Sequence, residues 1–198
     1  MHKLLLSCTL TLSLSAGAAT VKDAPLVSIA SHDAFFASLS ALCGKAFAGK
    51  VSVDTPSSDG FKGPLIMHVR KCTDQQLQIP FHVGDDHSRT WIISKTGSGL
   101  SLKHDHRKAN GDYDQSTMYG GHTVDAGFEH VQSFPADQYS KELFVRLGNP
   151  QSNSNIWQMY IYPNTFSYRL IREGREFRVD FDLTRAVALP PTPWGYKD

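Results

Sequence analysis

The chain has 198 residues, of which 20 are basic, 19 are acidic and 40% are hydrophobic. The near-neutral formal charge argues against a nucleic-acid-binding protein, because such proteins carry a clustered basic face, and against attachment to a strongly anionic membrane surface. The length is sufficient for one domain to bury a core of its own.

The first 19 residues have the three zones of a cleavable signal peptide. Lys3 supplies a positive charge, residues 4–14 are mainly apolar, and residues 15–19 are all small. Ala16 and Ala18 fit the pattern that signal peptidase recognises, so cleavage is predicted after Ala18 or Ala19. The apolar stretch is too short for a membrane span, which takes about 20 residues. The sequence therefore predicts a signal peptide at 1–19, a periplasmic or secreted protein without membrane insertion after cleavage, and a single β-barrel domain at 20–198.

Two cysteines, Cys43 and Cys72, remain after cleavage. An even number of cysteines in an oxidising compartment favours a disulfide, which would close a loop of about 30 residues and stabilise the fold by roughly 3–4 kcal/mol in the chain-entropy model. A redox-active pair is the alternative, but the Cys-x-x-Cys motif is absent.

An amphipathic helix is predicted to begin at Ser31 as its N-cap and to continue through apolar residues at helical spacing as far as Ala46. Gly44 or Gly49 can end it. From residue 65 the apolar period changes to two, which predicts strands near 65–70, 77–81, 91–93 and 100–102. The Thr-Gly-Ser-Gly stretch at 96–99 is predicted to be a hairpin turn between the last two.

The second half repeats this pattern. Strands are predicted at 117–123 and 128–134, and a short helix at 135–147. A meander follows, with strands predicted at 156–162, 165–172 and 176–184. A tail containing Pro190, Pro191 and Pro193 is predicted to be extended and mostly exposed.

About ten short antiparallel strands with hairpin spacing predict a mainly β protein, namely a meander barrel with one N-terminal helix and a short second helix. A helix ahead of a long meander resembles the calycin plan of lipocalins and fatty-acid-binding proteins, although the Gly-x-Trp signature of lipocalins is absent. This resemblance implies a ligand-holding barrel.

The sequence also resembles a group of uncharacterised exported bacterial proteins. This resemblance implies one exported domain without implying an activity. The stretches that carry the resemblance cover most of the mature chain. They are 41–44 (Ala-Leu-Cys-Gly), 82–85 (His-Val-Gly-Asp), 88–91 (Ser-Arg-Thr-Trp), 102–107 (Leu-Lys-His-Asp-His-Arg), 117–121 (Thr-Met-Tyr-Gly-Gly) and 181–185 (Phe-Asp-Leu-Thr-Arg).

Two histidines are the main candidates for a site. If Leu100 and Leu102 face the core, strand alternation places His104 and His106 on the same inward face. Two imidazoles with this spacing suit a metal ion, a polar ligand group or acid–base catalysis, although paired histidines outside a recognised motif more often lie in a solvated rim. The neighbouring loop could supply further groups, which are Asp112, Asp114, His122, Asp125 and His130.

Four further residues are predicted to contribute to ligand binding, namely Arg89, Trp91, Tyr119 and His122. Tyr119 and His122 flank the Gly120-Gly121 pair, and paired glycines in a strand indicate a bulge or a close backbone approach. Arg89 shares a face with Trp91 and could neutralise a ligand carboxylate or pack on the indole ring. Asn110, Asp112 and Asp114 are spaced like the opening of a calcium loop, but the later positions of that motif are missing.

These observations leave three hypotheses open. The first is an exported binding protein that holds a small, partly apolar ligand in or at the mouth of the barrel. The second is a metal-dependent hydrolase with His104 and His106 as metal ligands. The third is an envelope interaction module, which would expose an apolar patch on its outer face. Nucleophile, Walker and dinucleotide motifs are absent, so catalysis is not indicated and the sequence requires no cofactor, although a divalent metal is possible.

Overall fold

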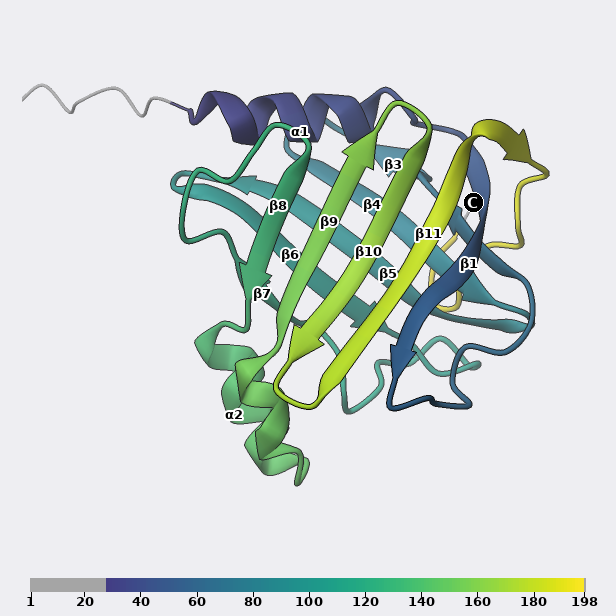
Figure 1. Cartoon of the computed structure of the whole chain (residues 1–198). Helices are drawn as coiled ribbons and strands as arrows, with labels where there is room; N and C mark the ends of the chain where they lie inside the picture. Colours follow the sequence, from purple (N-terminus) through teal and green to yellow (C-terminus); the bar gives the residue numbers. More distant parts are fainter. Residues whose placement is uncertain (1–27, 198) are drawn as a thin grey trace, which may run out of the picture.

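The computed structural model describes residues 28–197, so the predicted signal peptide lies outside the described residues. In this part of the chain, ten strands form an antiparallel sheet that curls into a nearly closed barrel (Figure 1), in the order β7-β6-β5-β4-β2-β1-β11-β10-β9-β8, and an eleventh, the short β3, lies outside this order and pairs with β4. The predicted fold class is therefore confirmed. The strands are β1 (Ala46–Thr55), β2 (Leu65–His68), β3 (Lys71–Cys72), β4 (Gln76–Val83), β5 (Asp86–Thr96), β6 (Gly99–His106), β7 (Tyr119–His122), β8 (Val131–Pro135), β9 (Ile156–Tyr162), β10 (Thr165–Arg172) and β11 (Arg175–Val187).

The barrel consists of two meanders joined by β1, which pairs with β2 on one side and with β11 on the other. The two edge strands of the sheet, β7 and β8, meet at a seam where Gly121 and Ala136 form a β-bridge. A Cβ on Gly120 would lie 1.9 Å from the Leu102 carbonyl oxygen, and one on Gly121 would lie 2.0 Å from that of Pro135. The glycine pair therefore marks a close backbone approach, one of the two features predicted for it.

The interior is filled mainly by aromatic side chains. Strand alternation directs Phe177, Val179 and Phe181 of β11 inward, as the sequence predicted, and all three are buried. The Trp91 ring stacks on Phe81 of the neighbouring strand β4 with a centroid separation of 4.9 Å and, across the barrel, on Tyr168 of β10 at 4.5 Å. This packing leaves no room for a long ligand in the middle of the described barrel.

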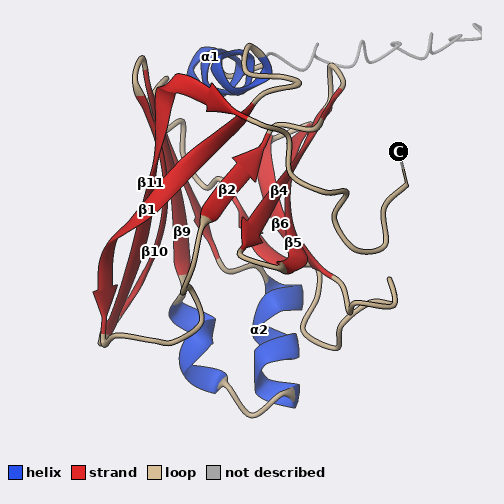
Figure 2. Cartoon of the chain, turned by 90° about the vertical axis from the view of Figure 1, so that its right-hand side faces the viewer, coloured by secondary structure: helices blue, strands red, loops and turns tan. Residues whose placement is uncertain are grey.

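Helices lie at opposite ends of the barrel (Figure 2). The helix α1 (Ala30–Ser40) covers one end and buries Phe35, Phe36 and Leu39. The helix α2 (Gln138–Arg146) and the short 3-10 helix η1 (Pro150–Ser154) lie at the other end. Asp137 caps α2, and its side chain accepts a hydrogen bond from the Ser140 backbone N–H. No helix within residues 28–197 is long and apolar enough to cross a membrane.

The structure corrects the predicted first helix. The N-cap is Ile29, whose apolar side chain cannot cap the helix, and Ser31 lies inside the first turn, where its hydroxyl donates to the Ala126 carbonyl. The helix also ends at Ser40, well before Ala46, which is the first residue of β1. The apolar residues that follow Ser40 therefore belong to a turn and a strand, and not to a continued helix.

The predicted disulfide joins Cys43, just after α1, to Cys72 in β3.

The prediction of an exposed tail is wrong for the last part of the tail. Residues 193–197, which we call the C-terminal strap, pack on the outer face of the barrel. The Trp194 backbone N–H donates to the His87 carbonyl (3.0 Å), and the Tyr196 hydroxyl donates to the Asp105 carboxylate (2.7 Å).

Candidate functional site

His104 lies inside the barrel, where its side chain is almost fully buried. Its Nδ1 is 3.1 Å from the Tyr119 carbonyl oxygen and its Nε2 is 2.8 Å from the Tyr168 hydroxyl. A carbonyl can only accept, so Nδ1 carries the proton and Nε2 accepts from Tyr168. The ring also stacks on Tyr119, with a centroid separation of 4.5 Å. Both nitrogens of His104 are therefore already engaged.

His106 and Tyr119 extend this cluster toward the α2 end of the barrel. The Tyr119 hydroxyl lies 3.2 Å from Nε2 of His106, and the two ring centroids are 5.5 Å apart. His104 and His106 therefore contact the same tyrosine ring from the same inward face of β6, as alternation predicted. His106 is partly buried and lies nearer the mouth.

The cluster is uncharged at neutral pH. Burial lowers the pKa of His104 to about 3, and the nearby His106 adds to this shift. Burial, followed by the positive charge of Arg89, lowers the pKa of His106 to about 4. Burial also raises the pKa of Tyr119 to about 12 and raises that of Tyr168 well above its usual range. Hydrogen bonds between neutral groups therefore hold the cluster together.

Arg89 and Trp91 face the same interior, from β5. Arg89 pairs across the strands with His106, and Trp91 pairs with His104. The Arg89 guanidinium forms an ion pair with Asp86 and lies 5.7 Å from the Phe61 ring centroid. Its charge is therefore already neutralised, and the predicted capture of a ligand carboxylate has no free cation at this position.

His122 lies apart from the other predicted ligand-binding residues. It is three residues from Tyr119 on β7, so strand alternation turns its side chain to the other face. Its Nε2 is 2.7 Å from the Thr96 hydroxyl, at the α1 end of the barrel. The structure therefore brings together Arg89, Trp91, His104, His106 and Tyr119 and leaves His122 outside.

The described residues do not provide a metal centre at the histidine pair. No group of three or more histidine, cysteine, aspartate or glutamate side chains in residues 28–197 is arranged to hold a metal ion. The loop residues proposed to complete the site form other contacts: Asp112 with Asn110, Asp114 with Ser116, Asp125 with Gly127, and His130 with Glu129. His104 would also have to lose an existing hydrogen bond before it could bind a metal.

A cavity of about 250 Å³ opens beside this cluster, at the mouth of the barrel next to α2 and η1. Half of its lining residues are aromatic and most of the others are polar, and they come from β7, β9, β10, β11, α2, η1 and the loops before β2 and β7. The lining residues are Phe61, Ser116, Tyr119, Phe144, Asn149, Ser152, Asn155, Trp157, Tyr168, Leu170, Arg175 and Phe177.

Asn155 provides a polar group at this cavity that the sequence analysis missed. It directly follows η1, and its side chain is 6% exposed. Its Oδ1 atom is buried without a hydrogen-bond partner among the described residues. Buried polar atoms normally have a partner, so this atom is a candidate contact for a bound molecule. An isolated asparagine in an irregular segment carries no sequence signal that could have identified it.

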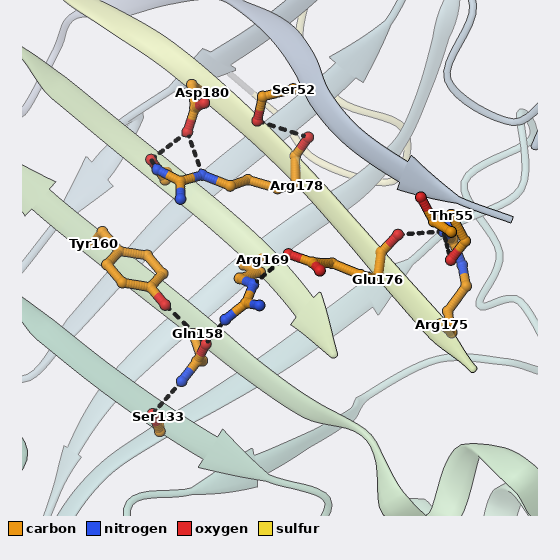
Figure 3. Close-up of polar contacts among 11 residues, drawn as sticks. Ser52, Thr55, Ser133, Gln158, Tyr160, Arg169, Arg175, Glu176, Arg178 and Asp180 are labelled. Carbon is orange, nitrogen blue, oxygen red and sulfur yellow. Dashed lines mark hydrogen bonds and ion pairs between the residues drawn. The ribbon is translucent and has the colours of Figure 1, made fainter. Parts of the chain in front are cut away.

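The outer face of β8 to β11 carries a network of polar side chains (Figure 3). Gln158 bridges Ser133 and Arg169, with donor–acceptor distances of 3.1 Å and 2.9 Å. Arg169 also pairs with Glu176, and Arg178 pairs with Asp180. This face therefore lacks the apolar character that an envelope interaction module would require at this part of the barrel.

The chain matches none of the family models, curated proteins or solved structures with which it was compared. Any inference about its function therefore rests on the geometry of this fold and its cavity.

Proposed function

We propose that this protein is an exported binding protein that holds a small, partly apolar ligand at the α2 end of its barrel. The observation that carries this proposal is the cavity at the mouth, half of whose lining residues are aromatic, with the unpartnered Oδ1 atom of Asn155 in its wall. Concave, mostly apolar sites with a few well-placed polar groups are typical of small-molecule binding.

The size of the cavity limits the ligand. Known small-molecule pockets span roughly 300–1,000 Å³, and this cavity of about 250 Å³ lies just below that range. The interior beyond it is filled by Trp91, Phe81 and Tyr168. A compact molecule therefore fits at the mouth, whereas a long acyl chain does not fit inside.

The charge of the site favours an uncharged ligand. The histidines and tyrosines of the cluster are neutral at pH 7, Arg89 is paired with Asp86, and Arg175 in the cavity wall is paired with Asp54 at 2.6 Å. The unpartnered Oδ1 of Asn155 is an acceptor. The preferred ligand is therefore a neutral molecule with a flat apolar face and one N–H or O–H donor.

Two observations support export. The Cys43–Cys72 disulfide is of the kind that persists in the periplasm and outside the cell. Residues 1–19 have the zones of a signal peptide. A nearly closed antiparallel barrel is also compatible with the calycin-like architecture inferred from the sequence.

Native mass spectrometry of freshly purified protein tests for a ligand that co-purifies. Indole serves as a defined probe because it is neutral and planar and has one N–H donor. In NMR titrations, we expect indole to shift the signals of Tyr119, Trp157 and Tyr168, and we expect Asn155→Leu to weaken binding by up to about tenfold through loss of one hydrogen bond.

Asn164→Leu, in the exposed β9–β10 turn, is the matched control and is expected to bind indole like the wild type. The proposal fails if the purified protein carries no ligand and indole does not bind. It fails equally if indole shifts residues elsewhere, or if Asn155→Leu binds indole as tightly as the wild type does.

A further inference from the structure

The C-terminal strap covers a polar part of the outer barrel face, away from the cavity. Besides the bonds of Trp194 and Tyr196, the Arg70 guanidinium donates to the Lys197 carbonyl at 2.9 Å. Tyr196 also lies 5.8 Å from the Arg107 guanidinium carbon. The outward-facing side chains of Thr90 and Asp105 are only 1–2% exposed. The strap is therefore a fixed part of the fold at neutral pH.

Two histidines directly contact each other beside the strap. Nδ1 of His82 lies 2.8 Å from Nδ1 of His87, and the ring centroids are 4.8 Å apart. This hydrogen bond requires one nitrogen with a proton and one without. His87 is also the strap's partner, because its carbonyl accepts from Trp194 and its ring lies 6.2 Å from the Trp194 ring.

The surroundings of the pair do not compensate a second positive charge. His68 from β2 is buried nearby and Arg70 follows it, so both neighbours on this side are basic or neutral. Asp86 is the carboxylate that faces the pair, and it is already bound to Arg89. The described part of the strap contributes Tyr196 and Lys197 and no carboxylate. Nε2 of His82 is itself buried without a partner in the described structure.

We propose that the His82–His87 pair is an acid-sensitive latch that holds the C-terminal strap at neutral pH and releases it in mild acid. When both imidazoles are protonated, both Nδ1 atoms carry hydrogen, so their hydrogen bond is lost and two cations repel at contact distance. Release of residues 193–197 removes this repulsion, because it admits water to the pair and exposes the outer face around Thr90 and Asp105.

The direction of the pH dependence follows from proton linkage. Burial, together with His87 and His68, lowers the pKa of His82 to about 4, from its ordinary value of 6.5. The released state therefore binds protons more readily, so the latch is fully effective above about pH 6.5 and weakens as the pH falls toward 4. If release restores the ordinary pKa completely, the equilibrium for strap closure weakens by at most about twentyfold between pH 7 and pH 5.

Amide NMR of the full chain between pH 7.5 and pH 4 tests the latch. The Trp194 and Tyr196 signals should move to positions typical of a free tail, whereas the Val179 signal in the core of β11 stays in place. In a His82→Gln/His87→Gln variant, the strap signals should no longer change with pH. His130→Gln, which removes an exposed histidine in another loop, is the matched control and should respond like the wild type.

A second variant keeps the proposal testable if the double variant does not fold. Trp194→Ala loosens the strap, and linkage then requires the pKa of His82 to rise toward 6.5. The proposal is overturned if the strap signals stay in place down to pH 4, or if they move only together with Val179. An unchanged pKa of His82 in Trp194→Ala also overturns it.

Discussion

His104 is held by both of its ring nitrogens in an aromatic environment. Such a residue is a structural constraint as much as a binding group, since it fixes how Tyr119 and Tyr168 face the cavity. A neutral imidazole is needed for this role, because Nε2 must accept a hydrogen bond from Tyr168.

Tyr168→Phe therefore tests the role of His104. The substitution removes the hydroxyl and leaves Nε2 buried without a donor, which should lower the free energy of unfolding by about 1–3 kcal/mol. Urea denaturation measures this value. Tyr162→Phe on the adjacent strand is the matched control, because Tyr162 is 46% exposed and should change stability by less than about 0.5 kcal/mol. Equal stability of the two variants would contradict the role given to His104.

For single residues, the sequence could predict to which face of a strand a side chain points, but not which residues it contacts. Alternation correctly placed His104 and His106 on one inward face, because a strand fixes side-chain direction by a period of two. The same rule applied to β7 would have separated His122 from Tyr119. Asn155 and Phe61 could not be predicted, because they lie in irregular segments where no periodicity indicates direction.

The elements of the barrel differ in how strongly their local sequence determines them. Residues 177–183 alternate cleanly, and β11 forms where the pattern predicted it. β1 was missed because its pairing with β11 contains two register irregularities and its burial does not alternate regularly. Its strand character depends on partners far away in the chain, which local periodicity does not reveal.

The close approach at β7 gives a prediction at the level of elements. Gly121→Ala would place a methyl group 2.0 Å from the Pro135 carbonyl oxygen, which is backbone and cannot rotate away. We expect a loss of at least about 1–3 kcal/mol of stability, measured by thermal unfolding. Gly60→Ala is the control, since a Cβ there meets nothing within 4 Å. Equal melting temperatures of the two variants would show that the backbones of β7 and β8 do not approach this closely at the seam.

The whole molecule buries several histidines in their neutral form. His82, His104 and His106 all have pKa values lowered to about 3–4 by burial, whereas an unfolded chain protonates histidine near pH 6.5. The unfolded state therefore takes up more protons, and stability should fall as the pH drops from 6.5 toward 4.

Unfolding in urea at pH 7.5 and at pH 5 checks this expectation. The burial of neutral His104 alone should lower the free energy of unfolding by about 2 kcal/mol at pH 5. Each pH unit below the ordinary pKa of histidine corresponds to about 1.4 kcal/mol. A barrel of equal stability at the two pH values would show that these histidines are not buried in neutral form.

The seam between β7 and β8 has a consequence for hydrogen exchange in one wall of the cavity. Tyr119, which forms one wall of the cavity, belongs to a four-residue strand whose link to β8 is the bridge at Gly121. Local opening costs least where few backbone bonds must break. We therefore expect the amides of β7 to exchange with deuterium faster than those of β10 or β11, and the cavity wall formed by Tyr119 to loosen more readily than the walls formed by those two strands.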